Sequence, residues 1–234
     1  MTFDSYTIQA RLKPSLLVWL PVGLAIVAWL PERFVGWGLL VGMSTTCGLT
    51  LLLAEAGRDQ GKLKEKVLFR KWGGTPTTQL LRHRDGWIDR NTKVRYHQKL
   101  QTFVPGITLP TPQEEDADPA AADETYASCI RYLIERTRNR KAFPLVFKEL
   151  VSYGFRRNLW GMKAPGALLA AFGALACATA IGARWGVSVP AAAIVATAIS
   201  AALVAFWLMH ITPEWVRTVA FAYAERLLAS LEKL

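Results

Sequence analysis

Four long apolar blocks constrain the fold of this sequence more than any other feature. They cover approximately residues 16–30, 35–54, 165–183 and 189–211. A bilayer core about 30 Å thick needs about 20 apolar helical residues, so the blocks are of the length that crosses a membrane. Short segments join the first block to the second and the third to the fourth. The pattern therefore predicts two transmembrane hairpins.

The first block has a second interpretation, because it is short and contains Pro21. A block of this kind near the N-terminus can be a signal peptide. No small-residue cleavage site follows it, however, and the second block begins after only Pro31–Phe34. We therefore favour a retained hairpin.

Positive charge indicates how the spans are oriented. The chain carries 28 Lys and Arg against 18 Asp and Glu. Of these basic residues, 21 lie between Glu55 and Lys163, whereas each short hairpin loop holds a single arginine. Lys and Arg close to membrane spans stay on the cytoplasmic side. We therefore expect a multi-pass protein with a cytoplasmic insert and cytoplasmic termini.

The expected fold class is all-α, a four-helix transmembrane protein with an all-α cytoplasmic domain inserted between the second and third spans. Residues 1–54 would form the N-terminal hairpin and 55–163 the basic helical domain. Residues 164–211 would form the second hairpin, and 212–234 a cytoplasmic amphipathic helix that lies on the membrane or packs on the insert. Glycine, proline and capping residues divide the insert. Its expected helices run over about 56–72, 76–84, 90–103, 119–139 and 144–160.

An acidic stretch follows the middle of the insert. It contains six carboxylates, and the sequence has no Lys or Arg between Leu100 and Ile130 to pair with them. We interpret it as a solvated loop, with a metal site as the alternative. A weaker metal candidate combines His83 with Asp85 and Asp89. The six carboxylates are Glu114, Glu115, Asp116, Asp118, Asp123 and Glu124.

Small residues at four-residue spacing mark the apolar blocks and allow close helix packing. This packing could join the helices of one bundle, or join subunits around a pore lined by the second block. No charged residue lies near a predicted midplane, which argues against a proton pump. The spaced residues are Gly38, Gly42 and Thr46, then Gly166, Ala170, Ala174, Ala178 and Gly182, then Ala193, Thr197, Ala201 and Ala205. The candidate pore-lining residues are Ser44, Thr45, Thr46 and Thr50.

The sequence lacks the motifs of the common enzyme classes. It contains no GxxxxGK[ST], GxSxG, HExxH or paired CxxC pattern, and its three cysteines lie far apart. We therefore expect no catalytic activity, no cofactor and no bound metal.

The segment KWGGTPTTQLLRHRDGW favours phosphate binding. Two adjacent glycines can form a backbone nest, a helix N-terminus offers free N–H groups, and flanking cations supply charge. The segment YGFRRNLWGMK interleaves cations with aromatic rings, which is typical of single-strand nucleic acid surfaces. Both segments also suit anionic headgroups or the membrane interface. The candidate ligand residues are Arg70, Lys71, Gly73, Gly74, Thr75, Thr77, Thr78, Arg82, Arg84, Arg156 and Arg157.

A family resemblance rests on four strings: KWGGTPTTQLLRHRD, TKVRYHQKL, EEDADP and TRNRKAFPLVFKELVSYGFRRNLWGMK. Together with the four apolar blocks, they resemble the membrane effector of Hailong-type bacterial anti-phage systems along the whole chain. The resemblance implies a homo-oligomeric channel of the inner membrane, with a tetramer as the first expectation. It also implies that a partner nucleotidyltransferase makes single-stranded DNA oligomers that hold the channel shut until a nuclease removes them.

The leading hypothesis is thus a channel gated by a DNA oligomer or another phosphate-rich ligand, embedded among membrane lipids. The alternative is a membrane-anchored scaffold without a pore, whose insert binds anionic lipid or an acidic protein. A membrane enzyme is the third possibility, disfavoured by the missing motifs.

Overall fold

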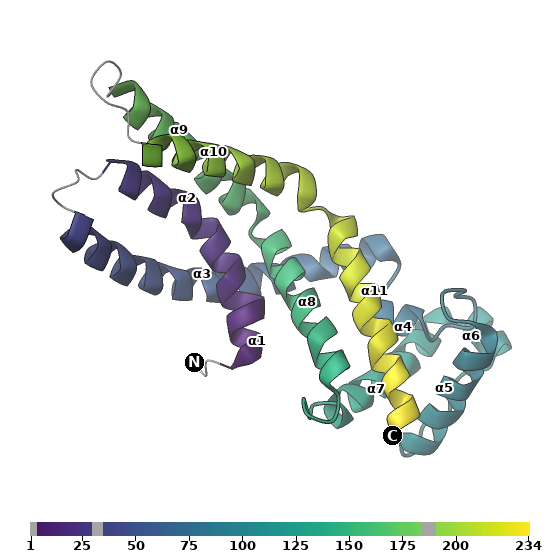
Figure 1. Cartoon of the computed structure of the whole chain (residues 1–234). Helices are drawn as coiled ribbons and strands as arrows, with labels where there is room; N and C mark the ends of the chain where they lie inside the picture. Colours follow the sequence, from purple (N-terminus) through teal and green to yellow (C-terminus); the bar gives the residue numbers. More distant parts are fainter. Residues whose placement is uncertain (1–3, 30–34, 184–190) are drawn as a thin grey trace. The chain divides into compact units, whose positions relative to one another are not determined.

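The structure, a computed structural model, describes residues 4–29, 35–183 and 191–234, with side chains from residue 48 onward in the second range. Within these ranges the regular structure is entirely helical, as the sequence predicts (Figure 1). The elements are α1 (Ser5–Thr7), η1 (Ile8–Leu12), α2 (Lys13–Trp29), α3 (Val35–Trp72), α4 (Pro76–Gln79), α5 (Arg90–Phe103), α6 (Pro112–Ala117), α7 (Pro119–Arg136), α8 (Pro144–Gly161), α9 (Lys163–Ala183), α10 (Ala191–Ala205), η3 (Phe206–His210), α11 (Pro213–Ala229) and η4 (Ser230–Lys233).

The chain divides into two compact units. The first contains Met1–Glu65 and Gly154–Val216, and the second contains Lys66–Tyr153 and Arg217–Leu234. Helices α3, α8 and α11 each contribute residues to both units. The units therefore divide the chain inside helices.

Three helices of the described part are long and apolar enough to cross a membrane. They cover Ser5–Trp29, Lys163–Ala183 and Ala191–His210. These helices are compatible with a membrane protein. The expected span 35–54 lies within α3, where the side chains of residues 35–47 are outside the described residues.

Helices α2, α9 and α10 pack side by side in the first unit (Figure 1). Large apolar side chains such as Leu168, Phe172 and Leu175 of α9 point outward and are more than 60% exposed. Small residues occupy the buried face instead. This distribution suits a lipid environment, in which apolar surface gains nothing by turning inward.

The buried stripes differ from the predicted four-residue spacing. A strict step of four residues drifts around a helix that has 3.6 residues per turn, whereas alternating steps of three and four stay on one face. Ala174 is therefore half-buried, and Ala178, Gly182, Ala201 and Ala205 are exposed. The buried residues are Gly166, Ala170, Gly173, Cys177 and Ala180 of α9, and Ala193, Ala196 and Ser200 of α10.

Two capping residues start helices of the second unit where the sequence predicts. Asp89 accepts a hydrogen bond from the Thr92 amide at the start of α5. Asp118 accepts from the amides of Ala120 and Ala121 at the start of α7. Such side chains satisfy amides that have no partner inside the helix. Two predictions were wrong: α4 ends at Gln79, short of Arg84, and the acidic stretch contains the short helix α6.

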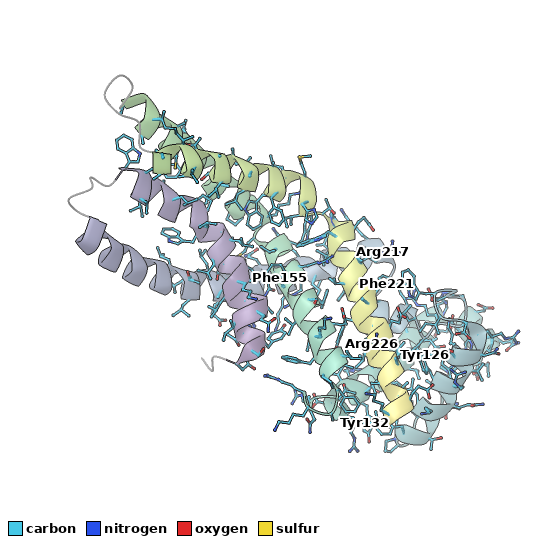
Figure 2. All side chains as sticks on the ribbon, in the orientation of Figure 1. Tyr126, Tyr132, Phe155, Arg217, Phe221 and Arg226 are labelled. Carbon is cyan, nitrogen blue, oxygen red and sulfur yellow. The ribbon has the colours of Figure 1, made fainter. Side chains whose placement is uncertain are left out.

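The core of the second unit joins α5, α7 and the end of α11. Its fully buried members include Leu100, Tyr126, Leu133 and Leu227. Phe221 of α11 belongs to the same core; it and Tyr126 are labelled in Figure 2. The C-terminal helix therefore packs on the helices of the insert, which was one of the two predicted positions.

Candidate functional site

The two glycines of the predicted phosphate site end helix α3. Gly73 and Gly74 have φ angles of +84° and +131°, which residues with a Cβ rarely adopt. The Gly73 amide donates to the Arg70 carbonyl, and the Gly74 amide donates to the Phe69 carbonyl at 2.8 Å. These bonds cap the helix. Because both amides are already used, the glycines do not form the open anion nest that the sequence suggested.

The threonines after the glycines also bond internally. Thr75 lies at the N-cap position of α4, but its hydroxyl donates to the Thr78 hydroxyl at 2.7 Å instead of capping the helix. Thr78 is 5% exposed, and Thr77 is half-buried. Helix α4 is only four residues long. This segment therefore serves as a packed turn more than as a row of free phosphate donors.

Arg70 and Lys71 remain accessible. Both are exposed in the last turn of α3. Among the residues that the structure describes, neither side chain makes a hydrogen bond or an ion pair. Of the predicted ligand residues, these two are best placed to meet an anion from solution.

Arg82 and Arg84, in contrast, are paired with the acidic stretch. Arg82 binds Asp123 through Nε at 2.8 Å and Nη2 at 2.5 Å. Arg84 binds Glu115 through Nη1 at 3.2 Å. Such two-pronged pairing fixes the guanidinium of Arg82 in one orientation. The two arginines therefore stabilise the unit through ion pairs. They were predicted to support the ligand as free cations, and this pairing removes the main reason for that prediction.

Glu115 lies at the centre of a buried polar network and is only 1% exposed. Its carboxylate accepts from the His83 amide at 2.8 Å, from the Tyr126 hydroxyl at 2.7 Å, and from the amide and side chain of Arg84. Burial alone would raise the pKa of Glu115, but these donors outweigh it and lower the pKa. The interpretation of the acidic stretch as a solvated loop was therefore wrong for Glu115.

The described residues contain no group of three His, Cys, Asp or Glu side chains that could hold a metal ion. His83 donates through Nε2 to the Pro110 carbonyl, and Asp89 caps α5. Asp85 accepts from the Trp87 amide. These contacts explain the histidine and the two aspartates without a metal.

Arg156 and Arg157 make packing contacts within the first unit. Arg157 is 9% exposed and binds Glu65 at 3.2 Å. Arg156 donates to the Trp215 carbonyl at 2.8 Å, and its guanidinium lies 4.7 Å from the Trp215 ring centroid. The cation of Arg156 thus packs on an aromatic ring from a distant part of the sequence. An open single-strand surface at these two residues finds no support.

The contact between α3 and α8 was not anticipated from the sequence. A Cβ atom on Gly161 would lie 2.5 Å from the Gly61 amide nitrogen, and one on Gly57 would lie 2.5 Å from the Met162 sulfur. Lys64 donates to the Gly161 carbonyl at 2.8 Å. The spacing Gly57–xxx–Gly61 is a known signal for close helix packing. It could have revealed this contact.

Three candidate pore-lining residues, Ser44, Thr45 and Thr46, lie outside the described side chains. Thr50 is described and is 6% exposed. Its hydroxyl has no hydrogen-bond partner in the described part of the chain. A buried polar atom without a partner costs free energy, so Thr50, like Trp72 at the end of α3, is a described position where a partner or water is needed.

Comparisons with protein-family models, curated proteins and solved structures find no match to this chain. The functional argument therefore depends on the residues themselves. Arg70 and Lys71 are accessible cations, whereas most of the other predicted ligand residues have bonding partners within their own unit.

Acidification is expected to destabilise the second unit through His97, which is 8% exposed. Burial lowers the pKa of His97 below its ordinary value of 6.5; His83 and Lys93 lower it further, while Leu81 and Glu115 oppose them. The unfolded chain therefore binds more protons once the pH falls below about 6.5, and the free energy of unfolding falls with it. Urea titrations at about pH 7.5 and about pH 5.5 measure the loss. An equal loss in the His97→Gln variant would contradict this assignment.

Proposed function

We propose that this protein is a homo-oligomeric membrane channel whose basic helical unit binds a phosphate-rich ligand. The observation that carries the proposal is helix α3, which runs for 38 residues without interruption from Val35 to Trp72. Its first half contains the expected second span, and its last turn contains Arg70 and Lys71. A ligand bound at that end would act on the same helix that contains the expected second span.

Contacts near the middle of helix α3 hold it to other residues of the first unit. The glycine contact with α8 and the pair between Glu65 and Arg157 lie between the expected span and the basic end. A ligand changes such an equilibrium only if it binds one gating state more tightly than the other. The proposed channel therefore has its ligand site and its gate on one continuous element.

The ligand we favour is a single-stranded DNA oligomer, and the setting is the inner membrane of a bacterium under phage attack. This proposal depends on the resemblance to Hailong-type membrane effectors. In it the insert and both termini are cytoplasmic, a partner nucleotidyltransferase supplies the oligomer, and its removal opens the channel and depolarises the cell. The chain itself performs no catalysis.

Ion flux from liposomes tests the channel directly. The purified full chain is reconstituted with a DNA oligomer, and flux is recorded before and after nuclease treatment. A rise after nuclease supports a channel that is held closed by nucleic acid. The absence of flux in both conditions would reject the channel.

Reversing the charge of Arg70 and Lys71 is expected to abolish ligand control. The double variant Arg70→Glu, Lys71→Glu would repel phosphate and weaken oligomer binding by at least about tenfold, because each lost phosphate contact removes electrostatic attraction. The matched control is Arg131→Glu, Lys148→Glu, which changes two exposed cations of other helices by the same charge. Nuclease should raise flux in the control and not in the variant. Ligand control that persists in both proteins would refute the assignment of the site.

A second candidate function is a membrane-anchored scaffold that binds anionic lipid or an acidic protein. The internal pairing of Arg82 and Arg84 favours it, since fewer cations than expected are left for a nucleic acid. The liposome experiment distinguishes the two functions, because a scaffold conducts no ions.

A further inference from the structure

A pocket of about 600 Å³ lies beside α5 in the second unit. It is lined by residues 83–86 and 88–90, by Lys93, Val94 and His97 of α5, and by Pro112 and Asp116 of α6. Its volume is within the range of small-molecule sites, which is about 300–1,000 Å³. The residues that the proposed function uses, Arg70 and Lys71, are not part of it.

Two histidines line this pocket, and each has one ring nitrogen without a hydrogen-bond partner among the described residues. Nε2 of His83 lies 2.9 Å from the Pro110 carbonyl, and Nε2 of His97 lies 2.8 Å from the Leu81 carbonyl. A carbonyl oxygen only accepts, so both Nε2 atoms carry the proton. In a neutral ring Nδ1 is then an acceptor, and burial favours the neutral form of His97, because it lowers the pKa of that ring. Neither Nδ1 atom has a hydrogen-bond partner among the described residues.

Most charged groups of the pocket are already paired. Lys93 is 5% exposed and donates to the carbonyls of Arg82 and Asp85, so it fixes the wall of the pocket. Asp89 caps α5. Two lining groups remain without a partner in the described part of the chain: the exposed cation Arg90 on α5 and the exposed carboxylate Asp116 on α6.

These groups define the chemistry of a ligand. The apolar side chains of Ile88, Val94 and Pro112 suit a flat, weakly polar ring. The histidine acceptors and Asp116 suit an edge that donates hydrogen bonds, and Arg90 suits an anionic group attached to the ring. A nucleotide whose base carries an exocyclic amine combines all three features, whereas thymine lacks the amine.

We infer that this pocket binds one amine-bearing nucleobase of the ligand, with the adjoining phosphate at Arg90. The inference deepens the proposed function and rests on it, since it assigns the base contacts that the α3 cations do not provide. Phosphate contacts position a nucleic acid, and base contacts select its sequence. The pocket would thus give the protein a preference for dA or dC over dT.

The test is oligomer binding to the purified full chain in detergent, measured by fluorescence anisotropy with labelled homopolymers of dA, dC and dT of equal length. At least one amine-bearing polymer is expected to bind about tenfold more tightly than dT, a difference of about 1.4 kcal/mol. Equal affinities for the three polymers would overturn the inference.

Two variants locate the preference, each with a matched control. Val94→Trp fills the pocket from a side chain that is 45% exposed, and Val67→Trp makes the same change on the exposed face of α3. Asp116→Asn removes the free carboxylate, and Glu124→Gln removes an exposed carboxylate outside the pocket. Circular dichroism confirms that each variant is folded. The preference should disappear in the two pocket variants and persist in the controls.

The outcomes separate this inference from the proposed function. A base preference that survives both pocket variants would overturn the pocket while leaving the channel intact. If the reconstituted protein gives no ion flux before or after nuclease treatment, the channel proposal is rejected, whichever base the chain prefers. If none of the polymers binds, both the pocket and the DNA ligand are overturned.

Discussion

Replacing Glu115 by Ala is expected to lower the free energy of unfolding of the second unit by about 2–4 kcal/mol. The side chain is 1% exposed, and its carboxylate accepts from the His83 amide, the Tyr126 hydroxyl and two groups of Arg84. Removing the carboxylate leaves the His83 amide and the buried Tyr126 hydroxyl without an acceptor, whereas the exposed Arg84 side chain can turn to solvent. A buried donor without a partner costs about 1–3 kcal/mol.

Urea titration of the full chain in detergent measures this loss, and hydrogen exchange locates it. The amides of His83 and Arg84 should lose protection first, because both donate directly to Glu115. The control is Glu124→Ala, which removes an exposed carboxylate of α7 and should change stability by less than about 0.5 kcal/mol. Similar losses in both variants would show that Glu115 does not organise the unit.

The Glu115 network also marks the limit of sequence reasoning. Helix starts at Asp89 and Asp118 were predictable because a cap and its amides lie within three residues of each other. The partners of Arg82 and Arg84 lie 41 and 31 residues away, in a stretch that had been interpreted as solvated. A single sequence contains no signal that links them. Their charges therefore looked available for a ligand when they were already paired.

The same limit applies to Arg156 and Arg157. Their sequence context predicts phosphate and base contacts as readily as it predicts packing, because both uses require cations and rings. The deciding facts are the positions of Glu65 and Trp215, which come from distant parts of the chain. Arg70 and Lys71 differ because they occupy the last turn of a helix that ends at two glycines. The local sequence pattern was therefore sufficient to predict that these two side chains are accessible.

Substituting Ala for glycine on α9 is expected to have opposite effects at two positions. A Cβ on Gly173 would lie 2.6 Å from the Pro21 Cβ and 2.7 Å from the Pro21 carbonyl oxygen, so α2 and α9 must separate. Overpacking of this kind costs about 1–3 kcal/mol. A Cβ on Gly182 meets nothing within 4 Å among the described residues. Because alanine has a better helix propensity than glycine, Gly182→Ala should leave the stability of the protein unchanged or raise it by up to about 1 kcal/mol.

The comparison controls for composition, since both variants place the same methyl group on the same helix. Unfolding by SDS, followed by circular dichroism, should give a lower midpoint for Gly173→Ala and an equal or higher midpoint for Gly182→Ala. Gly182 belongs to the four-residue stripe suggested by the sequence, whereas Gly173 belongs to the stripe that is buried against α2. If the midpoint falls for Gly182→Ala and not for Gly173→Ala, the α2–α9 packing described here is wrong. In that case the four-residue stripe is the packed face, either within one bundle or between subunits of the proposed oligomer.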